Sequence, residues 1–419
     1  MPNADQSTPR LLVADHCAGT IHLIDPAHPV VDESTRLLGK FGLSEHAGVL
    51  QLPDGAVAFV DDLIGRTILV DPRRPATHAI TATIPVATPA EHLAADPTGR
   101  HLVVTTGLGA NPEPWSDLLT AIDLTDPAQP DARRIRCRTG EPGVVIHGTG
   151  TDARLILRHR EPGSLEILHL QDVLAAPKGN PRLRGSEHPG SDDSAHGDLL
   201  LPGTDHLLVA ETTGVRRWTL ADDTPRHDCT LPWQAPGRGW FLRWSHTLHR
   251  ALSIVRSGGG DPHTWQSWGN ALWVHDPRYD RTHAIDLGPG LIFRCAPLAG
   301  GVAVARVHPD GDEIVVASIP EDSTSASQVA RRIPLPPMSS PPRPGESPWE
   351  NAQRRSITAD PHGSLVAVTS GGDGLVHLVD TADPRHGHRQ LPWPTSLDLG
   401  GILAWCDARP HPQVDSVGR

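Results

Sequence analysis

Short apolar segments alternate with turn residues along the whole chain. Two stretches show this most clearly, "HLAADPTGRHLVVTTG" from His92 and "SITADPHGSLVAVTSG" from Ser356. Each passes from a short apolar segment through an Asp-Pro-x-Gly turn into a run rich in β-branched residues, which is the pattern of a β-hairpin. The sequence therefore predicts short, paired strands.

A third strand follows the hairpin and ends in an Asp-containing turn. It recurs as "GTIHLIDP", "RTILVDP", "LLTAIDL", "ALWVHDP" and "GLVHLVDT", which begin at Gly19, Arg66, Leu118, Ala271 and Gly374. Alternating apolar residues closed by Asp and often Pro are typical of a strand that runs into a turn. A repeat of roughly 52 residues lies in the range of β-propeller blades.

The repeat divides the chain into blades. Seven complete four-strand units are expected to begin near residues 46, 92, 147, 196, 240, 293 and 356. Three strands in residues 10–42 and one in residues 399–407 are left over, and together they would close an eighth blade and remove an exposed sheet edge. We therefore predict a single all-β domain over residues 1–419, an eight-bladed β-propeller with residues 408–419 as a C-terminal tail. A seven-bladed propeller is the alternative.

Several of these segments also point to a known superfamily. "ADPTGRHLVVTT", "LTAIDLTDP" and "ADPHGSLVAVTSGGDGLVHLVDTADP" resemble repeats of the YVTN/lactonase-like and WD40-like β-propellers. The resemblance covers most of the chain, but it implies the fold alone. That superfamily includes lactonases, lyases, dehydrogenase subunits and noncatalytic scaffolds, so the reaction has to be argued from the residues.

Four histidines hold about the same place in successive blades. In a propeller the first strand of each blade lines the central channel, so residues just before it converge on one face. "SEHAGVLQLPDG" from Ser44 and "AEHLAADPTG" from Ala90 both place a Glu-His pair there. The complete set is His46, His92, His147 and His196.

Imidazole is the commonest side-chain ligand for divalent transition metals, and three nitrogen ligands with an open position make a common catalytic site. The sequence therefore predicts a divalent metal ion held by these four histidines. His46 and His92, with Glu45 and Glu91, are the catalytic candidates. The two glutamates rank lower, because neighbours on an extended strand point to opposite faces. A metal-free acid–base site and a hydrogen-bonded channel lining are the alternatives.

The other blades carry aromatic and guanidinium groups at the same place, which would suit a small-molecule substrate with an anionic or aromatic part. Two long loops and the segment "SPWENAQRRS" from Ser347, which includes Trp349 and Arg354, should lie on the same face, and His308 could add to it. The substrate-binding candidates are Trp240, Phe241, Arg294, Arg355, Trp265 and Trp268.

Composition narrows the function further. The formal net charge of -12, with no concentrated basic face, argues against a nucleic-acid partner. The N-terminus lacks the features of a signal peptide and no apolar run is long enough to span a membrane, so we expect a cytoplasmic protein without a membrane partner. The five cysteines contain no CxxC pair, and GxSxG, P-loop and HExxH motifs do not occur.

These observations favour a small-molecule enzyme with a His-lined metal site: a lyase, cyclase, isomerase or hydrolase, of bacterial specialised metabolism. The alternative is a noncatalytic propeller that binds a ligand or a protein partner. A quinone- or haem-dependent oxidoreductase is a third possibility, without a supporting motif.

Overall fold

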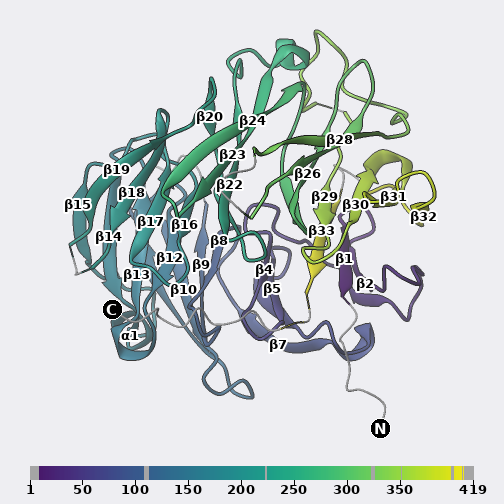
Figure 1. Ribbon diagram of the computed structural model, residues 1–419. Helices are drawn as coiled ribbons and strands as arrows, with labels where there is room; N and C mark the ends of the chain where they lie inside the picture. Colours follow the sequence, from purple (N-terminus) through teal and green to yellow (C-terminus); the bar gives the residue numbers. More distant parts are fainter. Residues whose placement is uncertain are drawn as a thin grey trace. The chain divides into compact units, whose positions relative to one another are not determined.

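The computed structural model describes residues 9–107, 113–221, 224–321, 326–350, 352–397, 401–407 and 409. Its regular structure is almost all strand, arranged as eight antiparallel sheets of four or five strands (Figure 1). The chain is therefore an eight-bladed β-propeller, as the repeat pattern predicts. Most of the predicted C-terminal tail, residues 408–419, lies outside the described residues. The described chain contains no helix that is long and apolar enough to cross a membrane.

The blades fall into two compact units. Unit 1 comprises Met1–Lys40, Pro75–Thr77 and Pro232–Asp407, and unit 2 comprises Phe41–Arg74, His78–Leu231 and Ala408–Arg419. Each unit holds four blades.

Unit 2 contains four consecutive blades, each built in sequence order. The first has β4 (Val49–Gln51), β5 (Val57–Asp61), β6 (Arg66–Val70) and β7 (Ile80–Pro85), and the second has β8 (Ala90–Ala95), β9 (His101–Thr106), β10 (Asp117–Asp123) and β11 (Asp131–Cys137). The third has β12 (Gly143–His147), β13 (Arg154–His159), β14 (Ser164–His169) and β15 (Ser186–Pro189). The fourth has β16 (Asp198–Leu200), β17 (His206–Ala210), β18 (Gly214–Thr219) and β19 (Arg226–Pro232). One short helix, α1 (Leu170–Leu174), follows β14.

Unit 1 contains three consecutive blades and the blade that both chain ends form. The first consecutive blade has β20 (Arg238–Gly239), β21 (Arg243–Ser245), β22 (Arg250–Arg256), β23 (Gly269–Asp276) and β24 (Arg281–Pro289). The second has β25 (Cys295–Leu298), β26 (Gly301–Arg306), β27 (Glu313–Ser318) and β28 (Gln328–Pro334). The third has β29 (Ile357–Ala359), β30 (Leu365–Ser370), β31 (Leu375–Asp380) and β32 (His388–Pro392).

The closing blade joins the two ends of the chain. It has the strand order β3 (Arg36–Gly39), β2 (Thr20–Ile24), β1 (Arg10–Asp15) and β33 (Ile402–Cys406). Leu12 pairs with Leu23 on one side and with Ala404 on the other. Figure 1 shows the yellow β33 beside the purple β1. The predicted closure by N- and C-terminal strands is confirmed.

The Asp-Pro-x-Gly turns form the hairpins that the sequence predicts. Between β8 and β9, Gly99 has a φ of +69°, a conformation that glycine adopts without a steric penalty, and its N–H donates to the Asp96 carbonyl at 3.0 Å. The Asp96 carboxylate accepts hydrogen bonds from the backbone N–H groups of Arg100 and His101. The carboxylate thus fixes the turn that sets the register of the blade.

Apolar side chains from neighbouring blades fill each unit. In unit 2, Val103 and Leu119 of one blade pack with Val144 and Leu155 of the next, and all four are buried. In unit 1, Leu252 and Val304 share a core cluster in the same way. Strands buried on both faces explain why the sequence shows apolar runs rather than strict alternation.

Candidate functional site

Three of the four predicted histidines lie where the first strand of a blade begins. His46 comes shortly before β4, His92 is the third residue of β8, and His196 comes two residues before β16. All three belong to unit 2.

His147 is placed differently from the prediction. It is the last residue of β12, not a residue before it, and its Nε2 atom lies 2.9 Å from Oδ1 of Asp205. A strand rises about 3.3 Å per residue, so His147 stands about 13 Å from the start of this five-residue strand. In "GVVIHGTG" the apolar residues precede the histidine, whereas they follow His46 and His92, and this difference is the sequence signal that marks the shift.

His46 and Glu91 form a close pair. The Nδ1 atom of His46 lies 3.0 Å from Oε1 of Glu91. The His46 side chain is 71% exposed and that of Glu91 is 10% exposed, so a buried carboxyl holds one nitrogen of an imidazole that faces solvent. Burial raises the pKa of Glu91, and the nearby Glu141 acts in the same direction, while His46 and Arg160 oppose the shift. Glu45, the other predicted glutamate, is half-buried and directly precedes His46 in the chain.

A β-bulge brings Glu91 into this pair. In the pairing of β8 with β9, Ala90 lies opposite Thr106 and His92 lies opposite Thr105, so Glu91 is the extra residue. A bulge re-aims the side chains of its strand, and the expected alternation of faces is lost there. The close approach of Gly107 matters too, because a Cβ at that position would lie 2.5 Å from Oε2 of Glu91.

A second carboxyl, missed in the sequence, lies near the same pair. Oδ1 of Asp62 accepts a hydrogen bond from the Ala90 N–H at 2.9 Å, and the Ser44 hydroxyl donates to the Ala90 carbonyl at 2.6 Å. Burial raises the pKa of Asp62, while hydrogen bonding of its own carboxyl group to the Ala90 N–H and to the Ser44 side chain, together with His46, lowers it. Asp62 and Ser44 thus hold the residue next to Glu91 in place.

An arginine–aspartate pair adjoins His92 and His196. The buried Arg158 donates from Nε to Oδ1 of Asp198 at 3.1 Å and from Nη1 to the Ala195 carbonyl at 2.9 Å. Burial lowers the pKa of His92 to about 4; Arg158 and His196 act in the same direction, while Asp198 opposes them. His92 is therefore a neutral imidazole at pH 7.

Sequence reasoning missed Arg158 and Asp198, which are 40 residues apart. The nearest signal is Gly143, the first residue of β12. A Cβ there would lie 2.2 Å from Oδ1 of Asp198 and 2.6 Å from Nη2 of Arg158, so only glycine leaves room for the ion pair.

The predicted metal site is not assembled by these residues. Over the described ranges, no group of three or more His, Cys, Asp or Glu side chains could hold a metal ion. His147 stands at the other end of its strand, His46 is engaged by Glu91, and the charge of Arg158 disfavours a cation beside His92 and His196. The donor set does not fit a four-histidine metal centre.

The predicted substrate-binding residues of unit 1 have different environments. Arg355 is buried and donates to Asp312, Thr369, Ser370 and the Pro336 carbonyl, so protein atoms take up its guanidinium. Trp265 is also buried, and its indole N–H donates to the Arg343 carbonyl at 3.1 Å. Both side chains support the fold.

Four further candidates have their own places in unit 1. Trp240 is 45% exposed, with the Cζ atom of Arg238 4.0 Å from its ring centre, and Arg294 is exposed. Phe241 is half-buried against the core between blades, and Trp268 is buried. Trp240 and Arg294 are therefore the two that a ligand could reach most readily.

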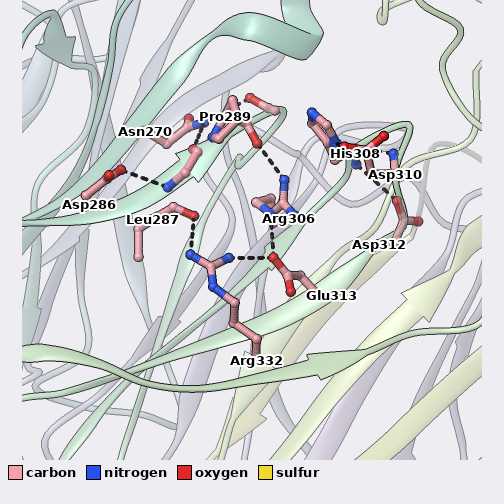
Figure 2. Close-up of polar contacts among 12 residues, drawn as sticks. Asn270, Asp286, Leu287, Pro289, Arg306, His308, Asp310, Asp312, Glu313 and Arg332 are labelled. Carbon is pink, nitrogen blue, oxygen red and sulfur yellow. Dashed lines mark hydrogen bonds and ion pairs between the residues drawn. The ribbon is translucent and has the colours of Figure 1, made fainter.

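Unit 1 also has a polar pocket of about 370 Å³ (Figure 2). Arg306 and Arg332 both donate to Oε1 of Glu313, at 2.6 and 2.5 Å, and Figure 2 shows Glu313 held by the two guanidinium groups. Their remaining donors reach the carbonyls of Pro289 and Leu287. At the other wall, the backbone N–H of Asp310 donates to Nδ1 of His308. The charges of the pocket are thus largely balanced by its own residues.

The solved structures that resemble the chain are β-propeller proteins. AztD from Citrobacter koseri superposes with a TM-score of 0.62 at 12% identity, covering 95% of this chain and 98% of that one. The dihydro-heme d1 dehydrogenase NirN superposes with a TM-score of 0.58 at 14% identity, covering 95% of this chain and 76% of that one. No protein-family model matches the chain, and no curated protein does. At these identities the likeness supports the propeller fold, in agreement with the superfamily resemblance.

Proposed function

We propose that the protein is a small-molecule enzyme in which His46 is the general acid–base residue and Glu91 positions it. The observation that carries the proposal is the 3.0 Å contact between Nδ1 of an exposed imidazole and Oε1 of a buried carboxyl. A carboxylate that accepts the Nδ1–H fixes the tautomer and makes Nε2 the basic atom that faces solvent. This is the arrangement of a general base that an acidic partner orients.

The reaction class follows from what the pair can do. Nε2 of His46 takes a proton from a substrate carbon or from a water molecule, and the imidazolium, stabilised by Glu91, returns a proton to the leaving group or to another atom of the substrate. Such a step serves a lyase, a cyclase, an isomerase or a hydrolase. The proposed mechanism does not use a metal ion, because His46, His92, His147 and His196, all described, do not come together as metal ligands.

The groups around His92 supply the polar contacts for a substrate. His92 is neutral at pH 7 and donates or accepts one hydrogen bond, while Arg158 and Asp198 stay paired with each other. We therefore propose an uncharged polar substrate for this site, with His92 and His196 as hydrogen-bonding partners.

The test is turnover of a defined panel of uncharged compounds: aryl esters, sugar lactones, β-hydroxy esters and 2-oxo esters, followed by mass spectrometry. We expect His46→Ala to lower kcat by about 10²–10⁴-fold for any compound that the protein converts, which is the usual contribution of a general base. Glu91→Gln should lower kcat less and shift the pH profile, because it removes the orienting charge but leaves the imidazole.

The matched control is His386→Ala. His386 is even more exposed than His46 and lies 3.3 Å from the carboxylate of Asp383, but that carboxylate is itself exposed. The variant should keep the full activity. Conversion by His46→Ala at the wild-type rate, or no conversion by the wild type, would overturn the proposal and favour a noncatalytic binding protein. Metal analysis of protein purified without chelator accompanies the assay, and we expect well below one ion per chain.

A further inference from the structure

Arg256, the last residue of β22 in unit 1, has an incompletely satisfied guanidinium. Its Nη2 donates to the Ile292 carbonyl at 2.6 Å, while its Nε is buried without a hydrogen-bond partner. It forms no ion pair with a carboxylate of the described residues. Burial lowers its pKa, with no nearby charged group adding to the effect. An arginine side chain stays protonated under such conditions, so a positive charge is held there without a counter-charge.

Arg256 is half-buried, and the three arginines that are fully buried in the described part of the chain are all paired. Arg158 lies 3.1 Å from Asp198, Arg250 lies 2.7 Å from Asp276, and Arg355 lies 2.7 Å from Asp312. Burying a charge is costly unless an opposite charge or a full set of acceptors compensates for it. Arg256 departs from this pattern.

Aromatic rings surround this guanidinium. Its Cζ atom lies 5.2 Å from the ring centre of Trp268 and 5.9 Å from that of Phe293. Trp349 packs against both rings, with centre-to-centre distances of 6.1 Å to Trp268 and 5.5 Å to Phe293. Trp349 is 39% exposed, so the cluster opens to solvent through this ring.

A second guanidinium, that of Arg354, lies near Trp349. The Cζ atom of Arg354 is 5.9 Å from the Trp349 ring centre, its Nη2 donates to the Trp349 carbonyl at 3.3 Å, and its Nε has no partner. Arg354, like Arg256, forms no ion pair with a described carboxylate. Trp349 is therefore close to Arg354 and packs against the two rings that lie near Arg256.

The segment that carries Trp349 is held in place by its own contacts. The Trp265 indole donates to the Arg343 carbonyl, and the Gln353 N–H donates to the Ser340 carbonyl at 3.0 Å. The Gly345 N–H donates to the His263 carbonyl at 3.2 Å. The aromatic cluster is thus part of a fixed surface.

We propose that Arg256, Trp268, Phe293, Trp349 and Arg354 form a binding site for an organic anion that carries an aromatic ring. The ring of the ligand stacks on Trp349, and the two guanidinium groups, neither of which pairs with a described carboxylate, compensate the charge of its carboxylate or phosphate. This site goes beyond the proposed function, because it uses neither His46 nor Glu91.

The test is ¹⁹F NMR of three probes titrated with the full-length protein: 4-fluorobenzoate, 4-fluorophenyl phosphate and the neutral 4-fluorobenzamide. We expect line broadening with at least one of the two anions. The neutral amide should bind at least about tenfold more weakly, because it lacks the charge that the guanidinium groups attract. The two anions together show which anionic group the site prefers.

Variants separate this site from nonspecific binding. Arg256→Gln and Arg354→Gln should each weaken anion binding about tenfold, and Trp349→Ala should abolish it. The control is Arg278→Gln. Arg278 also lies beside an exposed aromatic ring, that of Tyr279, but it is already paired with Asp276. Because Arg354 is partly exposed, its variant keeps the test valid if Arg256→Gln fails to fold. Equal binding of acid and amide, no binding of either anion, or unchanged affinity in Arg354→Gln would overturn the proposal.

Discussion

Burial shifts the pKa values of Glu91 and His92, both in unit 2, in opposite directions. It raises the pKa of Glu91 and lowers that of His92, and in both cases it favours the uncharged form. His46, whose side chain is 71% exposed, is the group of the cluster that can exchange protons with solvent. The division of labour follows from exposure: His46 moves protons, Glu91 orients it, and His92 stays neutral.

The low pKa of His92 predicts a pH dependence of stability. Its folded-state pKa of about 4 lies below its usual 6.5, so between these values the unfolded chain binds more protons than the folded one. The contribution is fully present above pH 6.5 and is lost as the pH falls toward 4. We expect His92→Gln to flatten this part of the curve of unfolding free energy against pH, measured in urea. The exposed His386 serves as control, and an unchanged slope in His92→Gln would contradict the assignment.

These residues show what the sequence can and cannot predict at this scale. The repeat located His46, His92 and His196 correctly at the start of a blade, because a turn and an apolar run follow each blade entrance. The repeat could not predict that Glu91 would pair with His46, since the bulge in β8 depends on pairing with β9. Arg158 and Asp198 meet only through folding of two neighbouring blades.

At the scale of elements, pairing within the closing blade protects the edge of β1. β1 is a central strand between β2 and β33, so its backbone groups are paired on both sides, while β3 has a neighbour on one side only. Hydrogen bonds to β33 leave β1 without an exposed edge. The N-terminal and C-terminal segments therefore contribute to one cooperative sheet.

This arrangement predicts unequal effects of proline in β1 and β3. Val13→Pro removes a ladder hydrogen bond in a central strand, where Val13 pairs with His22 and Leu403. Because a buried backbone acceptor then loses its donor, the variant should lose about 1–3 kcal/mol of unfolding free energy. Leu38→Pro lies on the outer strand, where its loss should be smaller. Thermal unfolding followed by circular dichroism measures both. Equal losses would show that β33 does not pair with β1 in solution.

At the scale of the molecule, repetition makes the fold predictable and the site only partly so. The same strand pattern recurs in eight similar units, and the strands left over at the two ends, in residues 10–42 and 399–407, predict the closing blade. A site depends instead on single positions. His147 lies at the end of β12, not before it, because its apolar neighbours precede it. Arg355 and Trp265, predicted to bind substrate, are buried and support the fold.

The central claim is that Glu91 activates His46. The direct measurement is the rate of modification of His46 by diethyl pyrocarbonate at pH 7, followed by peptide mass spectrometry in the wild type, in Glu91→Gln and in the control Asp383→Asn. If the Glu91 carboxyl group holds Nδ1 of His46 and leaves Nε2 as the nucleophilic nitrogen, His46 reacts faster than His386. Glu91→Gln then slows the reaction of His46 about tenfold, whereas Asp383→Asn leaves it unchanged. Equal rates for His46 in the wild type and in Glu91→Gln would contradict the claim.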